Sequence, residues 1–390
     1  MATSTGVWRE RAPMREGDTP LIDATRHGRL ADVAGLLSGG ADVNEPKTDG
    51  SGATALLVAA QEGHMEVVVA LLAAGATVHA AEGGQPALRY AAARGHLEVV
   101  ATLLEAGACV EGAEACDRTP LYVACRNGHV EVVAALLAAG AHADVAQSNE
   151  ATPLFAASRA GHVDILAALL TAGARVDGAK RPDGWPDGVR PLWAASRNGH
   201  AEAVSALLAA GAEVDPIAQS PGNDATKTTP LWVACIKGHA DVVSVLINAG
   251  ASIDWSDRDD RGTPLMAASQ QGHVEVLTVL LAAGATVNLT DVDRHTAMTL
   301  ACDRGHLTCA KLLSSYGATR TFHAAPDDNF TAEEIATGTD HEALTAFLVE
   351  SRLWSTPLHH LRIIDAARAR ELLRGGADLH AAAAAGGPTP

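Results

Sequence analysis

The dipeptide Gly-His recurs along the chain at a spacing close to 33 residues, and this period constrains the fold more than any other feature. The pairs begin at Gly63, Gly95, Gly128, Gly161, Gly199, Gly238, Gly272 and Gly305. Gly28 lies 35 residues before the first pair, with Arg29 in the place of the histidine. Because a fixed period of about 20 to 50 residues is typical of stacked repeats, the sequence predicts one array of similar units rather than separate globular domains.

Each unit carries the signals of two short helices. A Thr-Pro pair or its remnant lies nine residues before the Gly-His glycine, and a second glycine follows twelve residues after it. Threonine caps a helix by accepting a backbone N–H, and proline fits the first helical position. In residues 191–211, the first helix is expected to end at Gly199 and the second at Gly211. Each unit therefore reads as helix, turn, helix and extended arm, with rows of Ala and Leu buried against the neighbouring units.

Residues 119–141, TPLYVACRNGHVEVVAALLAAGA, resemble the ankyrin repeat, whose pattern is T-P-L-H-x-A-A-x-x-G-H-x-E-x-V-x-x-L-L-x-x-G-A. The resemblance covers roughly residues 17–380. It implies an all-α solenoid of L-shaped units, each with a β-hairpin arm, that binds proteins on the concave face formed by the arms and first helices. One departure concerns the histidine of T-P-L-H. Its place is taken by Leu57, Arg89, Tyr122, Phe155, Trp193, Trp232, Met266 and Thr299.

We count nine clear repeats and two weak ones. The predicted organisation is a disordered segment at 1–16, the array at 17–328, a degenerate repeat that could cap the array at 329–352, a partial repeat at 353–380 and a disordered tail at 381–390. Residues 330–351 keep Thr331 but lose the Gly-His pair. Since Thr389-Pro390 stands where another first helix would begin, we expect a longer natural form, with 354–390 either a loosely docked remnant or a true eleventh repeat.

The charge of the chain and its lack of targeting segments bear on which partners and which cellular compartment are expected. Acidic residues outnumber basic ones 46 to 29, and the net charge is −17. With no run of Lys or Arg, this balance disfavours nucleic-acid and anionic-membrane partners. The sequence shows neither an apolar N-terminal signal nor a membrane-spanning stretch. We therefore expect a monomer in the cytoplasm, with the nucleus as an alternative, and six reduced cysteines.

Histidines and cysteines are the residues that could suggest chemistry. The Gly-His histidines could be metal ligands, or turn residues that bond to backbone. Stacked helices lie about 8–10 Å apart, whereas ligands lie about 2 Å from a metal, so histidines one repeat apart cannot share an ion. Cys125, Cys235 and Cys302 share a slot that holds Ala or Ser elsewhere. No nucleophile elbow or phosphate loop occurs, and we predict a protein with no catalytic residues, metal or cofactor.

Two rows of residues are candidates for partner contact. The first, which we call the aromatic row, contains Tyr122, Phe155, Trp193 and Trp232 at one equivalent position in four consecutive repeats, and Met266 holds this position in the next repeat. These side chains either pack under the arms or form a partly exposed ladder, and Trp and Tyr are frequent at interface hot spots. The second row consists of the two residues before each Gly-His. Seven of nine such pairs carry Arg or Lys, which either complement the helix dipole or form a basic stripe matched to an acidic peptide or surface.

Insertions in residues 179–188 and 216–227 lengthen two adjacent arms beside these rows. The predicted protein-binding residues are Tyr122, Arg126, Phe155, Arg159, Trp185, Trp193, Arg197, Trp232, Lys237 and Met266. The predicted function is a scaffold or adaptor that binds a partner protein on the concave face, centred on repeats four to seven. The alternative is the substrate-recognition region of a larger multidomain protein, such as a ubiquitin-ligase adaptor.

Overall fold

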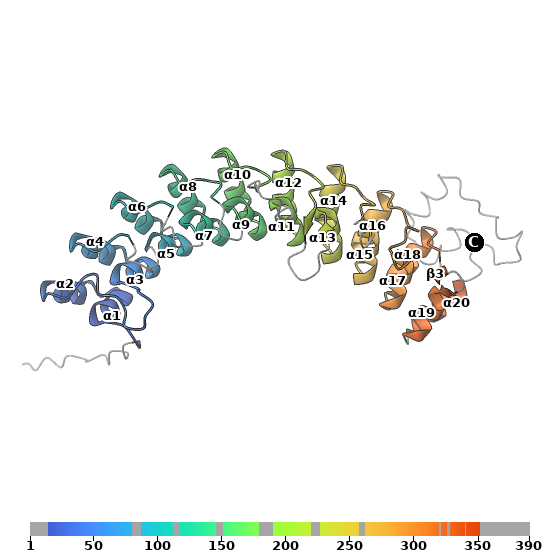
Figure 1. The fold of residues 1–390 in the computed structure, drawn as a ribbon, viewed down its shortest axis with the longest axis horizontal. Coiled ribbons are helices and arrows are strands. Elements are labelled where there is room, and N and C mark those ends of the chain that lie inside the picture. The colour runs from blue at the N-terminus through green and yellow to red at the C-terminus, as the bar shows by residue number, and fades with distance from the viewer. Residues whose placement is uncertain are drawn as a thin grey trace, which may run out of the picture. The chain divides into compact units, whose positions relative to one another are not determined.

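The computed structural model describes residues 15–79, 87–111, 118–145, 151–178, 190–219, 227–256, 262–319, 321–325, 328–339 and 341–351. Within these ranges the chain forms twenty α-helices in ten successive pairs, together with four short strands (Figure 1). The predicted all-α repeat architecture is therefore confirmed. The boundaries predicted at 16, 328, 352 and 380 stay predictions, and residues 352–390 lie outside the described residues.

The first helices of the pairs are α1 (Pro20–Arg26), α3 (Ala55–Glu62), α5 (Ala87–Arg94), α7 (Pro120–Asn127), α9 (Pro153–Ala160), α11 (Pro191–Arg197), α13 (Pro230–Lys237), α15 (Pro264–Gln271), α17 (Ala297–Asp303) and α19 (Ala332–Gly338). The second helices are α2 (Leu30–Ser38), α4 (Met65–Ala73), α6 (Leu97–Glu105), α8 (Val130–Ala138), α10 (Val163–Thr171), α12 (Ala201–Ala209), α14 (Ala240–Asn248), α16 (Val274–Ala282), α18 (Leu307–Ser315) and α20 (Glu342–Glu350).

The first helices start and stop where the repeated motif places its signals. Thr119 accepts a hydrogen bond from the backbone N–H of Tyr122 at 3.2 Å, and Thr229 does the same for Trp232 at 3.2 Å. The helix that begins at Thr119 ends at Gly128, which has a left-handed backbone with φ of +85°. Threonine satisfies a backbone donor that has no partner inside the helix, and glycine takes the left-handed conformation with little strain.

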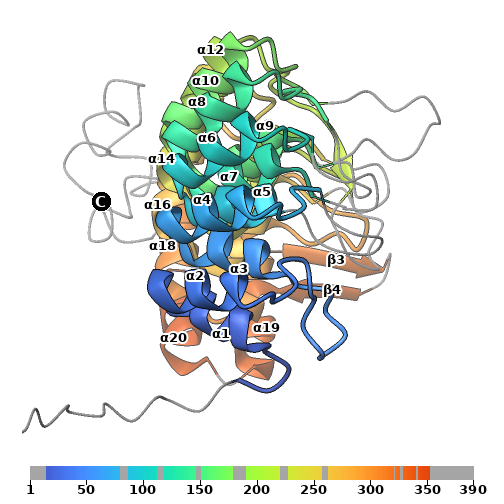
Figure 2. The same cartoon turned by 90° about the vertical axis from the view of Figure 1, so that its left-hand side faces the viewer.

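The chain divides into two compact units, one of residues 1–157 and 164–175, the other of residues 158–163 and 176–390. In the first unit, α1, α3, α5 and α7 pack in sequence, as do α2, α4, α6 and α8. In the second unit, the first-helix layer consists of α11, α13, α15, α17 and α19. The second-helix layer consists of α12, α14, α16, α18 and α20, which lie along one side of the view in Figure 2. The cores consist of fully buried aliphatic side chains such as Leu121, Val133, Leu192 and Leu246, as the Ala and Leu rows predict.

Each Gly-His histidine whose bond is resolved ties its repeat to the preceding one. The Nε2–H of His200 donates to the carbonyl oxygen of Arg159 at 3.1 Å, and His239 donates to that of Arg197 at 3.1 Å. Because a carbonyl can only accept, the proton must lie on Nε2 in these bonds. The same bond links His64, His96, His129, His273 and His306 to the preceding repeat. We call this contact the histidine pin, and it confirms a structural role for these residues.

The glycine of each Gly-His pair leaves room for the pin. A Cβ built on Gly199 would lie 2.7 Å from Nδ1 of His239, and one on Gly161 would lie 2.6 Å from Nδ1 of His200. Both distances are shorter than a van der Waals contact. Glycine is therefore required by its left-handed backbone and also by the ring of the next repeat.

The repeat at 330–351 retains more of the motif than the sequence suggested. His341 precedes α20 and bonds to the carbonyl oxygen of Asp303 at 3.4 Å. A Cβ on Gly305 would lie 2.5 Å from the ring of His341, as in the regular repeats. The expectation that this repeat loses its Gly-His is correct for the glycine only, because the histidine keeps its register from Thr331.

Short strands form where two arms are described. β1 (Ala218–Gln219) pairs antiparallel with β2 (Lys227–Thr228), and β3 (Thr321–Ala325) pairs antiparallel with β4 (Asp328–Thr331). The first hairpin lies in the insertion at 216–227, so this lengthened arm includes a β-ladder. Among the described helices, none combines the length and apolar character that crossing a bilayer requires.

Candidate protein-binding site

Three cations project from the ends of first helices in the second unit. Arg159, Arg197 and Lys237 stand at or next to the last residue of α9, α11 and α13, and all three side chains are exposed. None of them forms an ion pair within the described part of the chain. The guanidinium of Arg197 lies 5.5 Å from the centroid of the Trp193 ring, which is within cation–π range. We refer to Arg159, Arg197 and Lys237 as the cation row.

The histidine pins hold the backbone of this row. The carbonyl oxygens of Arg159 and Arg197 accept from His200 and His239, so each arginine is fixed to the repeat that follows it. In the next repeat the histidine pin from His273 bonds to the carbonyl oxygen of Ile236, and Lys237 is the residue after it. Two arginines therefore share one register, and the lysine follows with a long flexible side chain.

The aromatic row is mostly packed, not exposed. Trp193 is 2% exposed, and its Nε1–H donates to Oγ1 of Thr228 in β2 at 3.0 Å. Tyr122 and Met266 are buried as well, at 6% and 2% exposure. The hypothesis of an exposed ladder is wrong for these three residues, because a buried side chain presents no surface to a partner. The packed alternative fits Trp193, since the arm of the following repeat covers it.

Two members of the aromatic row keep part of their surface. Phe155 and Trp232 are half-buried, and the indole N–H of Trp232 donates to the carbonyl oxygen of Gly262 at 3.1 Å. Trp232 thus has its polar edge satisfied and is partly exposed, five residues before Lys237 on the same helix. In the first unit Arg126 is exposed at the end of α7. Trp185 lies outside the described residues.

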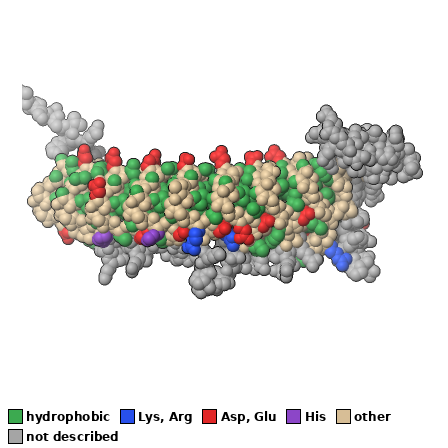
Figure 3. Space-filling view, turned by 90° about the horizontal axis from the view of Figure 1, so that it is seen from above, with side chains coloured by type: hydrophobic (Ala, Val, Ile, Leu, Met, Phe, Trp, Pro, Cys, Tyr) green, Lys and Arg blue, Asp and Glu red, His purple; other side chains and the backbone are tan. Residues whose placement is uncertain are grey.

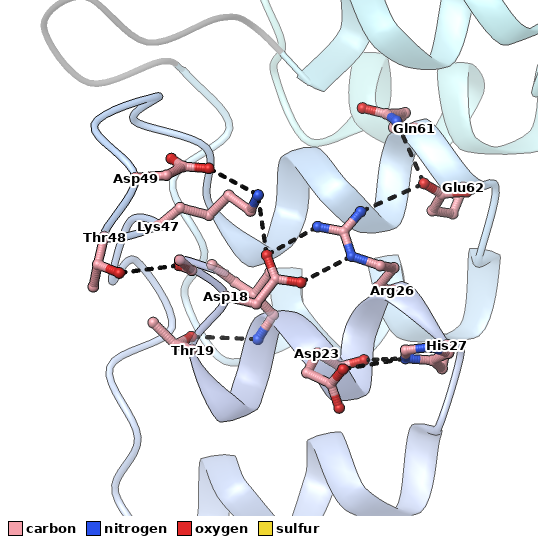
Figure 4. Close-up of polar contacts among 12 residues, drawn as sticks. Asp18, Thr19, Asp23, Arg26, His27, Lys47, Thr48, Asp49, Gln61 and Glu62 are labelled. Carbon is pink, nitrogen blue, oxygen red and sulfur yellow. Dashed lines mark hydrogen bonds and ion pairs between the residues drawn. The ribbon is translucent and has the colours of Figure 1, made fainter. Parts of the chain in front are cut away.

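The first repeat uses its basic residue differently. Arg26 occupies the position of Arg159 and Arg197 in its repeat, but its Nε donates to Asp18 at 2.9 Å and its Nη2 to the same carboxylate at 3.0 Å (Figure 4). The side chains of Asp18 and Arg26 are 0% and 9% exposed. The Nζ atom of Lys47 lies 3.0 Å from Oδ1 of Asp18 and 3.0 Å from Oδ2 of Asp49. These groups form a closed cluster, which we call the Asp18 cluster.

Ionisation in the Asp18 cluster follows its geometry. Burial acts to raise the pKa of Asp18, but the hydrogen bonds from Arg26 and Lys47 outweigh it and hold that pKa below its usual range. The bond to Asp18 raises the pKa of Arg26. Hydrogen bonds from Ser51, together with Lys47, lower the pKa of Asp49 to about 2. No pattern in the sequence predicted this cluster, and its one visible signal is an aspartate directly before the capping threonine.

Acidic side chains form a row on the second helices. One stands in the first turn of α2, α4, α6, α8, α10, α12, α14, α16 and α20. In each unit, Asp and Glu side chains stand along one edge of the second-helix face (Figure 3). An acid near a helix N-terminus is stabilised by the helix dipole, which explains the row without a ligand.

The thiols and histidines offer no metal centre in the described part of the chain. No group of three His, Cys, Asp or Glu side chains there could hold an ion. Cys125 and Cys235 are fully buried in the small-residue slot of their first helices, and burial raises the pKa of both thiols. Burial also raises the pKa of Cys309, to about 11. These buried thiols are therefore protonated at neutral pH and act as small packing groups.

The stacked helix pairs, their histidine pins and the exposed residues at the ends of the first helices are typical of a repeat scaffold of the kind that binds other proteins. The family model for ankyrin repeats matches residues 45–113, 110–180, 143–220 and 192–291. The chain therefore belongs to the ankyrin repeat family, whose members generally bind proteins and are typically not enzymes. The chain is similar to the crystal structure of the human ASB11 ankyrin repeat domain, with 34% identity, 55% of this chain and 90% of that chain covered, and a TM-score of 0.48. No curated protein matches the chain.

Proposed function

We propose that the protein is a non-catalytic recognition module whose partner engages the first-helix face of the second unit. One observation carries the proposal: Arg159, Arg197 and Lys237 are exposed in successive repeats and form no ion pair with a described residue. The partner would present an acidic peptide or surface to this row. We further propose that the module acts as a monomer in the cytoplasm, since its net charge of −17 opposes self-association.

The helix dipole alone does not account for the cation row. A cation in the last turn gains about 0.3–1 kcal/mol from the dipole, and this interaction does not occupy the hydrogen-bond donors of the side chain. The guanidinium donors of Arg159 and Arg197 remain open for a carboxylate, which guanidinium groups bind in bidentate geometry. The partly exposed Trp232, five residues before Lys237 on α13, would offer the partner an apolar contact. Charge and apolar surface together are typical of interface hot spots.

The test is charge reversal of the row. The variant Arg159→Glu/Arg197→Glu/Lys237→Glu should bind the partner at least about a hundredfold more weakly, which corresponds to about 2.7 kcal/mol. Its helix content and melting temperature should stay close to those of the parent protein. Partners can be isolated by affinity capture with the parent chain and compared with captures by the variant. A variant that retains every partner at unchanged affinity would remove the row from the proposed site.

The same surface would serve a self-contained adaptor and the recognition region of a larger protein, including a ubiquitin-ligase adaptor. The reversal variant therefore tests the recognition surface in either setting.

A further inference from the structure

We infer that the partner segment over the cation row is an extended polyproline-II segment with an aspartate or glutamate at every third position. This inference rests on the proposed function and specifies the chemistry of the partner. It combines three observations. The row has one cation per repeat, the histidine pins hold two of its members at one register, and a half-buried tryptophan, Trp232, stands five residues before Lys237 on α13.

The spacing of the cations follows from the packing. The first helices α11 and α13 pack directly against each other, and helices in contact lie about 8–10 Å apart. Arg159 and Arg197 share one register because the same histidine bond, at 3.1 Å in both cases, holds their carbonyl oxygens. Arg197 and Lys237 are therefore about one helix separation apart, with the lysine one residue beyond the pinned position, and the His200 bond ties Arg159 to the repeat of Arg197. We expect a similar spacing between Arg159 and Arg197, because they hold the same position in adjacent repeats.

Among regular backbone conformations, polyproline II fits this spacing best. It rises about 3.1 Å per residue with three residues per turn, so every third side chain points the same way, about 9 Å apart. In a β-strand, residues three apart point to opposite faces. An α-helix rises about 1.5 Å per residue and needs about seven residues to cover the distance. One acid in three residues can therefore meet one cation per repeat only in the polyproline-II form.

The apolar neighbours of the row suit such a segment. Ile236 packs against Trp193 and Val233 and is half-buried, and Trp232 keeps part of its ring open. Pro-rich segments dock on aromatic-lined surfaces because their conformation is formed before binding, which lowers the entropic cost. Proline or another apolar residue between the acids would contact Ile236 and Trp232, while the carboxylates reach the cations.

The acidity of the chain does not prevent this contact. The acids in the first turns of α12 and α14 follow the cations after a short turn, since Glu202 comes five residues after Arg197 and Asp241 four residues after Lys237. Within the described part of the chain neither acid forms an ion pair with a cation of the row, so the cations keep their hydrogen-bond donors for a partner. An arginine that touches a carboxylate of the partner binds it in bidentate geometry. The local cations therefore dominate over the net charge of −17.

Four synthetic peptides test the inference on the full chain by fluorescence anisotropy. The first is four copies of Glu-Pro-Pro. The second has the same composition but its four glutamates in one block. The third is a helical peptide with glutamates seven residues apart, and the fourth is four copies of Lys-Pro-Pro. We expect the first peptide to bind about tenfold or more tightly than each of the others.

Variants connect the binding to the row. Arg197→Glu should weaken the periodic glutamate peptide about tenfold. The matched control Ser205→Glu/Thr278→Glu changes the net charge by the same two units at exposed positions on α12 and α16, and it should leave binding within about twofold. The triple reversal Arg159→Glu/Arg197→Glu/Lys237→Glu should bind the lysine peptide in preference to the glutamate peptide.

The outcomes separate this inference from the proposed function. Equal binding of the periodic and block peptides, or tighter binding of the helical peptide, would overturn the polyproline-II assignment. If no peptide binds but the triple reversal still releases the captured partner, the proposed function stands and the inference is wrong. If the triple reversal keeps its partner, the proposed function is wrong, whatever the peptides do.

Discussion

Arg26 in the first repeat and Arg197 in the second unit occupy the same slot and have different fates. Each lies two residues before a glycine, and each offers its carbonyl oxygen to the histidine of the next repeat. The side chain of Arg26 is enclosed by Asp18, whereas that of Arg197 is exposed above Trp193. The difference lies before the capping position, where the first repeat has Asp18 and the later one has Val189. An arginine at this position is therefore a candidate for partner binding only in a repeat that has no acidic residue directly before its capping position.

The largest expected effect concerns what the two regions share. Gly63→Ala and Gly199→Ala should each cost about 3 kcal/mol of unfolding free energy, because the left-handed backbone is strained by a Cβ and that Cβ meets a histidine ring. Gly211→Ala is the control. It has a φ of +88° with open space around it, so only the backbone term of about 1 kcal/mol remains. Equilibrium unfolding in urea measures all three. Equal costs at Gly199 and Gly211 would show that the ring of His239 accommodates the added methyl group without a penalty.

The next effect should be confined to the first repeat. Asp18→Asn leaves the largely enclosed charges of Arg26 and Lys47 without their shared partner, which should cost about 2–3 kcal/mol. Because the repeats contact only their neighbours, the loss should appear as faster amide exchange in α1 and α2, with α13 to α16 unchanged. Uniform loss of protection along the array would contradict this local role.

A smaller effect compares the two arginines directly. Arg26→Gln should cost about 1–2 kcal/mol of stability because it breaks the buried pair with Asp18, and Arg197→Gln should cost less than about 0.5 kcal/mol. Binding of the partner should show the reverse order, with Arg197→Gln weakening it and Arg26→Gln leaving it unchanged. Matched melting curves and anisotropy titrations give both quantities. An equal loss of partner affinity in the two variants would contradict the assignment of a structural role to Arg26 and a binding role to Arg197.

The smallest effect is the pH dependence of the Asp18 cluster. The folded-state pKa of Asp18 lies below its usual value of 3.8, and that of Asp49 lies near 2. The folded state therefore takes up protons less readily than the unfolded chain, and stability falls as the pH drops from about 4 toward 2. Protection of α1 amides should decrease over that window in the parent protein. In Asp18→Asn this decrease should be smaller, and an identical pH profile would count against the cluster.

Much of the fold could be predicted because its signals are local. The threonine caps, the left-handed glycines and the period of the aliphatic residues each depend on a few neighbouring residues, and the structure reproduces them. Burial of the aromatic row could not be predicted in the same way. Trp193 is covered through Thr228, which lies 35 residues further along the chain in the following arm.

The role of Asp18 was also hidden from sequence reasoning. Its partners are Arg26, eight residues away, and Lys47 in the next arm, and only the folded arm brings them together. His341 was missed for a simpler reason. Its repeat keeps the histidine ten residues after Thr331, as in the regular repeats, but has no glycine before it, so the Gly-His pair does not mark this position.

The pins and the arms lie at opposite ends of the first helices. The length of an arm can therefore change without altering the contact between neighbouring repeats. Two arms have gained residues, as 17 positions separate Gly173 from Arg190 and 18 separate Gly211 from Thr229. The pins that follow these insertions still measure 3.1 Å, the same as the pin of His129 on Ala93 after a repeat of regular length. Arm length can therefore vary between related proteins, or be varied by design, while the histidine pins keep the stacking register of the repeats.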